Sequence, residues 1–202
     1  MPFPIEDKLV VAVSSSAVFD MTAADQIFRT EGVGPYRAHQ LERLDDPFEK
    51  GVAFPFIKRL LRLNEVFPDL QPIEVIVLSR NDPDSGRRFF RCCRSYGLTI
   101  SRGAFLNGKS PYPYISAFNA SLFLSATEAD VRNAIDAKLP AGLVLPTLVT
   151  DEDTDSELRV AFDFDGVIID DEAEAVFQET KDLNRFHKSE TSKILFLTIL
   201  AL

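Results

Sequence analysis

The chain has 202 residues, of which 46% are hydrophobic and 10% aromatic, and its formal net charge is −9 at pH 7. A chain of this length and composition can bury a hydrophobic core and form one domain or slightly more. The acidic charge argues against a nucleic-acid binder and against a protein of anionic membrane surfaces. An enzyme of this charge that acts on a phosphate ester would be expected to use a metal ion.

The cysteines, Cys92 and Cys93, are adjacent in the sequence. Adjacent cysteines rarely form a structural disulfide, so we expect a reducing, cytoplasmic compartment, and burial rather than thiol reactivity is favoured for both. The N-terminal "MPFPIEDK" does not resemble a signal peptide, and the C-terminal "ILFLTILAL" is too short to span a bilayer.

The first part of the chain alternates short β-rich runs with longer segments of helical period. The runs that predict strands are 8–16, 72–82, 98–105, 120–126 and 141–147. The segments that predict helices are 23–32, 54–67, 85–97 and 128–139. This alternation predicts an α/β fold, with a Rossmann-like parallel sheet and helices on both of its faces.

Two local patterns refine this prediction. Thr127 is expected to cap the helix at 128–139, with Asp130 at the capping-box position. The segment "SRNDPDSG" (79–86) is interpreted as a strand end followed by a turn, and contact with a nucleotide is the alternative.

The chain is expected to have four parts. Residues 8–147 form the first α/β repeat, and the acidic segment 148–157 is a linker or exposed loop. Residues 158–190 are expected to begin with a sixth strand at 158–166 and to continue as a helix. Residues 191–202 form an atypical apolar tail.

The start of the sixth strand resembles the start of the chain. "VAVSSSAVFDMTAADQIFR" (11–29) aligns without a gap on "VAFDFDGVIIDDEAEAVFQ" (160–178). We interpret this as an internal duplication of one strand–loop–helix unit, although two unrelated units of similar composition would also align. In this alignment Ser14 and Ser16 stand where the second copy has Asp163 and Asp165.

Asp163 and Asp165 are the candidate catalytic and metal-binding residues. Residues two apart in an extended segment point to the same side, and two such carboxylates are compatible with a bound Mg²⁺. One carboxylate could act as nucleophile on phosphorus and the other as acid–base, with Gly166 allowing a tight turn. The alternative is a strand cap before an acidic helix start, which is the interpretation favoured for Asp170, Asp171, Glu172 and Glu174.

Several motifs carry a resemblance to a known family. "FDFDGV" resembles the first motif of the haloacid dehalogenase (HAD) superfamily of phosphohydrolases. More closely, the chain resembles the cytosolic 5'-nucleotidase type 1 family over roughly residues 8 to 188. The motifs are "VAVSSSAVFDM", "GVAFPFIKRLLRLN", "VIVLSRNDPDSG", "SPYPYISAFNASLFLSA" and "LRVAFDFDGVIIDDEAE".

This resemblance implies Mg²⁺-dependent hydrolysis of nucleoside 5'-monophosphates, AMP-like ones first. It implies that Asp163 is the nucleophile, which becomes an aspartyl phosphate, and that Asp165 is the acid–base. It further implies that both help to hold Mg²⁺, Asp165 usually through its backbone carbonyl. Two alternatives are a non-catalytic module that binds a nucleotide or a partner, and a phosphatase of another small phosphate ester.

The superfamily also uses a Ser or Thr, a lysine and an acidic pair, which in this family follow the Asp-x-Asp in the same repeat. The residues after Asp163 supply none of these, and "TSKILFLTILAL" departs from the polar, helical style before it. We therefore expect a truncated member of the family, with a complete degenerate repeat and the first unit of the catalytic one. Weak or absent turnover is expected of it, and a genuine apolar C-terminal element is the alternative.

Overall fold

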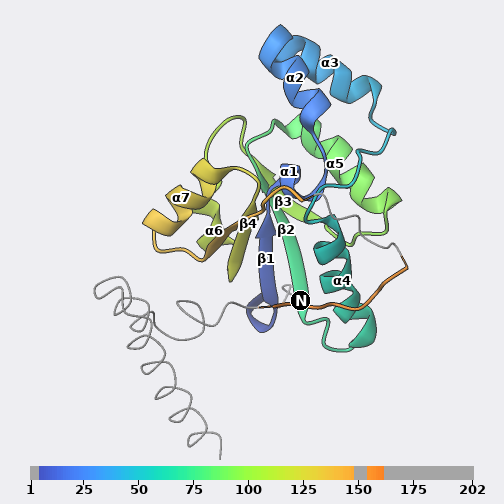
Figure 1. Ribbon diagram of the computed structural model, residues 1–202, viewed down its shortest axis with the longest axis vertical. Helices are drawn as coiled ribbons and strands as arrows, with labels where there is room; N and C mark the ends of the chain where they lie inside the picture. The colour runs from blue at the N-terminus through green and yellow to red at the C-terminus, as the bar shows by residue number, and fades with distance from the viewer. Residues whose placement is uncertain (1–4, 148–153, 162–202) are drawn as a thin grey trace, which may run out of the picture. The chain divides into compact units, whose positions relative to one another are not determined.

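The computed structural model describes residues 5–147 and 154–161 (Figure 1). Within these residues, parallel strands form one sheet in the order β3-β2-β1-β4-β5. The strands are β1 (Leu9–Val13), β2 (Ile73–Ser79), β3 (Arg102–Phe105), β4 (Leu122–Ser125) and β5 (Ala141–Leu143). The predicted parallel α/β sheet is confirmed, although β3 and β5 are shorter than expected.

Helices connect these strands. They are the 3-10 helix η1 (Ile5–Asp7), α1 (Ser15–Val18), α2 (Thr22–Glu31), α3 (Val33–Glu42), α4 (Phe54–Val66), α5 (Pro83–Ser95), α6 (Pro113–Ala117) and α7 (Glu128–Asp136). The predicted helices correspond to α2, α4, α5 and α7. The sequence did not predict α1, α3 or α6. Two of these are very short, and α3 begins with "VGP", which is a poor helix signal.

Both faces of the sheet are covered. Successive side chains of a strand point to opposite faces, so β1 supplies two hydrophobic clusters. Val11 and Val13 pack with buried residues of α4 and α5. Val10 and Ala12 pack with buried residues of α6 and α7. Figure 1 shows the two helix layers on either side of the strands. Burial on both faces explains why the central strands are almost continuously apolar.

A helical insertion follows β1. An isolated antiparallel bridge joins Phe19 to Lys50, and the backbone N–H of Gly51 donates to the carbonyl of Val18 at 2.8 Å. The residues between the two sides of this bridge contain α2 and α3, which Figure 1 shows beyond the strand ends that carry α1. A Cβ at Gly51 would lie 2.8 Å from the carbonyl oxygen of Ala17, so the close approach of the two chains requires glycine.

Side chains fasten this insertion to α5. The Tyr36 and Ser85 hydroxyls are 2.7 Å apart, and Ser85 Oγ donates to Asp82 Oδ1 at 2.9 Å. Arg37 Nε donates to Asp82 Oδ2 at 3.0 Å. Asp82 is also the N-cap of α5, where its Oδ1 accepts from the backbone N–H of Ser85.

The predicted strand end at Ser79 is confirmed, but α5 begins at Pro83, earlier than the sequence suggested.

The predicted strand at 158–166 lies largely outside the described residues. Residues 158–161 are described and form no strand.

The buried free thiols of Cys92 and Cys93 confirm the prediction of burial. In the part of the chain that is described, no helix is long and apolar enough to cross a membrane.

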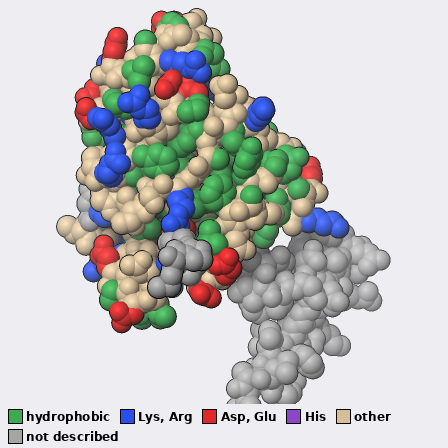
Figure 2. Space-filling model, turned by 180° about the vertical axis from the view of Figure 1, so that it is seen from behind, with side chains coloured by type: hydrophobic (Ala, Val, Ile, Leu, Met, Phe, Trp, Pro, Cys, Tyr) green, Lys and Arg blue, Asp and Glu red, His purple; other side chains and the backbone are tan. Residues whose placement is uncertain are grey.

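The described surface also carries large hydrophobic side chains. Leu70 is 75% exposed and Leu145 is 67% exposed. Figure 2 shows hydrophobic side chains gathered across the middle of the rear face. Single exposed apolar residues are common on folded proteins, and nothing seated on this face identifies a partner.

Candidate functional site

The candidate site lies at the carboxyl ends of three neighbouring strands. The chain passes from β1 to β2 and β3 on one side, and then crosses to β4 and β5 on the other. Such a reversal leaves a crevice outside the strand ends, where parallel α/β sheets bind ligands. Ser14, Ser79 and Ser125 stand at the ends of β1, β2 and β4 and are all buried.

Serine hydroxyls join these strand ends. The Ser15 and Ser79 hydroxyls are 2.8 Å apart. Ser14 Oγ accepts from the backbone N–H groups of Ala17, at 3.2 Å, and Ala126, at 3.3 Å. Ser14 is thus the N-cap of α1 and also connects β1 to the chain after β4. These serines have a structural reason to be present.

The two serines that align with the aspartate pair lie together. Ser14 Oγ and Ser16 Oγ are 3.3 Å apart. A hydroxyl without a base is a poor nucleophile, and it binds a divalent cation less well than a carboxylate does. Among the residues that the structure describes, no group of three or more His, Cys, Asp or Glu side chains could hold a metal ion. The predicted site residues themselves, Asp163 and Asp165, lie outside the described residues.

Arg80 and Asp130 form an ion pair at the edge of this site. Arg80 Nε donates to both carboxylate oxygens of Asp130, at 2.8 and 3.0 Å, and Ser110 Oγ donates to Asp130 Oδ1 at 3.1 Å. The hydrogen bonding of Arg80 to the Asp130 carboxylate, which accepts, raises the pKa of Arg80, so the guanidinium stays charged. The capping-box prediction was wrong: Thr127 occupies the N-cap position, but no side-chain hydrogen bond caps α7 there.

A small polar cavity of about 140 Å³ opens among these groups. It is lined by Ser14, Ser15, Ser16, Met21, Asp25, Leu78, Ser79, Arg80, Asn81, Thr127 and Asp130. Asp25 reaches it from α2, and burial raises the pKa of its carboxyl group. The cavity has hydroxyl, amide and carboxylate groups for binding a small polar ligand, but its lining includes no histidine, lysine or cysteine that could serve as base or nucleophile.

The sequence placed Asp130 in a capping box and did not single out Asp25. It raised Arg80 and Asn81 only as part of the segment 79–86, for which contact with a nucleotide is the alternative to a turn. The signal for these two residues is their position just after a predicted strand. Asp130 and Arg80 are far apart in the chain, and only the sheet order brings β2 and β4 to either side of β1. Local periodicity carries no information on such a pairing.

Comparisons with known proteins bear on the identity of the chain. The family model described as 5'-nucleotidase matches residues 1–195. Human cytosolic 5'-nucleotidase 1B is 30% identical over 197 residues, which cover 94% of this chain and 32% of that protein. This chain therefore spans about a third of the length of that relative. No solved structure matches. The match over nearly the whole chain confirms the resemblance found in its motifs: the chain belongs to the 5'-nucleotidase family.

Proposed function

We propose that this chain takes part in the hydrolysis of nucleoside 5'-monophosphates, AMP-like ones first, and that Asp163 and Asp165 carry the reaction. The observation that supports this most is the family match, which extends over both the serine-bearing strand end and the Asp-x-Asp segment. The printed hydrogen bonds of the serines at the first of these go to other hydroxyls, to backbone N–H groups and to Asn81, and not to a carboxylate, so we assign the chemistry to the second. The relative is named cytosolic, and we propose a cytoplasmic location for this chain too.

In the proposed reaction Asp163 attacks phosphorus. An Oδ–P bond forms, the P–O5' bond breaks, and Asp165 gives a proton to the departing 5'-oxygen. Asp165 then takes a proton from a water that attacks the same phosphorus. The Oδ–P bond breaks, inorganic phosphate leaves, and both aspartates return to their starting states.

The donor set of this segment fits Mg²⁺. Carboxylate and carbonyl oxygens are the ligands that Mg²⁺ prefers, and Asp163 and Asp165 supply both kinds two residues apart. When bound, the ion would offset the negative charge of the phosphate in this acidic protein. We propose that Asp163 holds it through its side chain and Asp165 through its backbone carbonyl.

The test is phosphate release from AMP with and without Mg²⁺. We expect phosphate release that depends on Mg²⁺, because the aspartate pair would supply the nucleophile, the acid–base and the ligands of the ion. Asp163→Asn should abolish it. Asp170→Asn removes the same charge close by in the chain and should leave the rate unchanged. Equal loss in both variants, or release without Mg²⁺, would overturn the proposal.

The second candidate is a non-catalytic module that binds a nucleotide. The polar cavity of about 140 Å³ supports it only as a site for one polar group of the nucleotide, since pockets that enclose a whole small ligand measure about 300–1,000 Å³. Calorimetric titration with AMP in the presence of a chelator separates the two candidates. Binding that Asn81→Ala weakens, together with no phosphate release under any condition, would favour the module. A panel of small phosphate esters separates the nucleotidase from a general phosphatase, since only the former prefers nucleoside monophosphates.

A further inference from the structure

Another cavity lies at the opposite end of the sheet from the serine-bearing strand ends. It measures about 450 Å³, within the range of about 300–1,000 Å³ that encloses a small organic ligand. Gln71, just before β2, and Thr99, between α5 and β3, both line it, so it lies near the amino ends of these strands. Its lining residues belong to the compact unit Met1–Leu158, so the cavity is built within one unit.

The charges around this cavity favour an anion. Of the described residues that line it, Lys58, Arg59 and Arg62 are cationic, and Glu65 and Asp155 are anionic. Arg62 follows Lys58 by four residues and Arg59 by three, so it neighbours both on the surface of α4. The cavity therefore carries an excess of positive charge in a chain whose formal net charge is −9.

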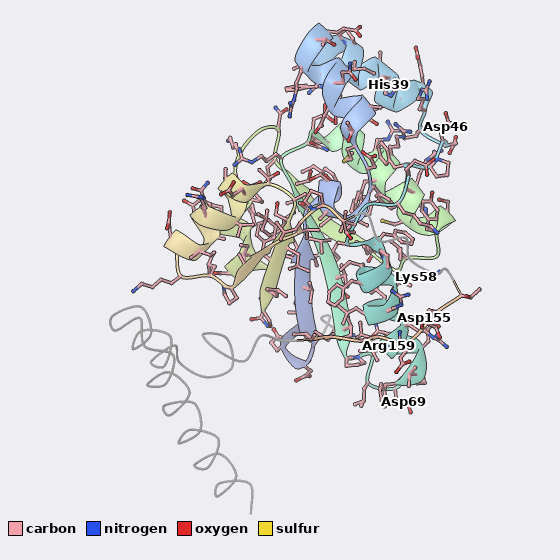
Figure 3. The ribbon with its side chains drawn as sticks, viewed as in Figure 1. His39, Asp46, Lys58, Asp69, Asp155 and Arg159 are labelled. Atoms are coloured by element: carbon pink, nitrogen blue, oxygen red, sulfur yellow. The ribbon has the colours of Figure 1, made fainter. Side chains whose placement is uncertain are left out.

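The chain itself supplies oxygen acceptors to the two arginines. Arg59 Nε donates to the backbone carbonyl of Asp155 at 3.1 Å, and Arg62 Nη1 donates to that of Ser156 at 3.3 Å. The Asp155 carboxylate lies 4.0 Å from Arg59 Nη2, which is too long for a hydrogen bond. Figure 3 shows Asp155 beside α4, near Lys58. Both guanidinium groups thus meet oxygen acceptors at this cavity, and guanidinium is the group that best recognises carboxylate and phosphate oxygens.

The lining also has an apolar part. Leu61 and Leu98 are buried members of the hydrophobic cluster under α4 and α5, and Tyr96 packs against the same cluster. The Tyr96 hydroxyl donates to the backbone carbonyl of Phe48 at 2.8 Å, which fixes this side chain. A preformed apolar surface next to cationic groups suits a ligand that has both an apolar body and an anionic group.

We propose that this cavity binds a small organic anion, with its charged group at Arg59 and Arg62 and its apolar body at Leu61 and Leu98. Two guanidinium groups favour a doubly charged phosphorus oxyanion over a carboxylate, because each can form paired hydrogen bonds with its oxygens. The Asp155 carboxylate competes with the ligand for Arg59. This inference goes beyond the proposed function and does not rest on it.

Calorimetric titration of the full chain with phenylphosphonate, in the presence of a chelator, tests the site. This probe carries a ring and a dianion, and its phosphorus is bonded to carbon, so it is not a phosphate ester. We expect a dissociation constant of about 1 mM or below. Inorganic phosphate lacks the ring and benzoate lacks the second charge, so both should bind at least about threefold more weakly. Equal affinity for either, or no binding of phenylphosphonate, would overturn the proposal.

Substitutions of opposite sign test the charges. Arg59→Gln/Arg62→Gln should weaken phenylphosphonate binding at least about tenfold, whereas Asp155→Asn should strengthen it about threefold because the competing carboxylate is lost.

Matched controls remove the same charge from exposed side chains that do not line the cavity. Arg87→Gln/Arg132→Gln is the control for the arginine pair, and Asp69→Asn is the control for Asp155→Asn. Neither control should change the affinity by more than about twofold, as expected for screened charges at a distance. Equal effects in a variant and its control would overturn the proposal.

Heteronuclear NMR locates the site in the wild-type chain, so the test stands even if an arginine variant fails to fold. Phenylphosphonate should shift the amide signals of residues 58–65 and 96–99 and leave those of residues 14–16 and 79–81 unchanged. Shifts confined to 14–16 and 79–81 would place the probe in the polar cavity among the serines and would overturn the proposal. Phosphate release from AMP is a separate measurement, so its failure would leave this site intact.

Discussion

Arg80 donates hydrogen bonds to the Asp130 carboxylate from two guanidinium nitrogens, Nε and Nη2, and the pair links the end of β2 to the first turn of α7. The side chain of Asp130 is 3% exposed, whereas that of Arg80 is 37% exposed. The attraction within such a pair makes only a small net contribution to stability. Removal of one partner destabilises the protein more, because the buried partner would remain charged without a counter-charge. The switch point of the sheet is therefore braced by an ion pair next to the polar cavity.

Arg80→Ala should lower the free energy of unfolding by about 2 kcal/mol, since it leaves the buried Asp130 carboxylate without its cation. Urea denaturation followed by circular dichroism measures the change. Arg132→Ala, which removes an exposed i,i+4 pair with Glu128, serves as the control and should cost at most about 0.5 kcal/mol. Equal losses of unfolding free energy in the two variants would show that the Arg80–Asp130 pair stabilises the fold no more than an exposed ion pair does.

Gly51→Ala should destabilise the protein by about 2 kcal/mol. The added Cβ would lie 2.8 Å from backbone atoms of Ala17 and Phe19, which cannot rotate out of the way as a side chain could. Gly34→Ala on α3 is the matched control, because no atom lies within 4 Å of the added Cβ. It should be neutral or slightly stabilising. Thermal unfolding of both variants provides the comparison, and similar melting temperatures would contradict the close packing at Gly51.

Asp25 and Asp20 should show opposite pH dependences. Burial raises the pKa of Asp25, so the stability associated with its protonated form is lost as the pH rises through the folded-state value. Asp25→Asn should therefore be more stable than wild type near neutral pH, and the difference should disappear in acid. Urea titrations at about pH 7 and about pH 4, near the ordinary pKa of an aspartate, measure it.

Hydrogen bonds from Thr22 lower the pKa of Asp20, so its contribution is present above the unfolded-state pKa and is lost as the pH falls. Asp20→Asn should accordingly be less stable than wild type near neutral pH and equal to it in acid. The same titrations apply. A shift of the same sign in both variants would mean that burial of Asp25 does not govern its ionisation.

The thiols of the folded protein should be unreactive. Burial raises the pKa of Cys93 to about 12, and burial likewise raises that of Cys92, whose sulfur accepts from the backbone N–H of Phe48 at 3.3 Å. An aromatic disulfide reagent at mildly alkaline pH should label neither thiol before urea is added and both after it. Rapid labelling in the absence of urea would contradict the buried placement.

The sequence predicted the layers of the fold well, because strand runs such as that around Val75–Val77 and the period of α4 follow from burial on the sheet. It missed α3, where Gly34 and Pro35 weaken the local helix signal. That helix is held by tertiary contacts instead, through Tyr36 and Arg37 to α5. Tertiary packing of this kind overrides local propensity and is invisible to a window of sequence.

The predicted catalytic residues, Asp163 and Asp165, lie outside the described residues, so their roles stay a prediction. The alignment of Ser14 and Ser16 with them is a local pattern, but Ser16 lies in α1 and not in extended chain, so the 3.3 Å between the two serine hydroxyls does not test the placement expected for the aspartates. The Arg80–Asp130 brace and the contacts of Arg59 with Asp155 join residues far apart in the chain. Only the sheet order and the return of the chain to α4 create those contacts.

In the proposed reaction Asp163, and not a serine of the first repeat, receives the phosphoryl group. Labelling with AMP that carries radioactive phosphorus, followed by rapid acid quench and peptide mapping, tests it directly. We expect Mg²⁺-dependent label on the peptide that contains Asp163 and none on the peptide that contains Ser14 and Ser16. Label on the serine peptide, or no label on either, would contradict it.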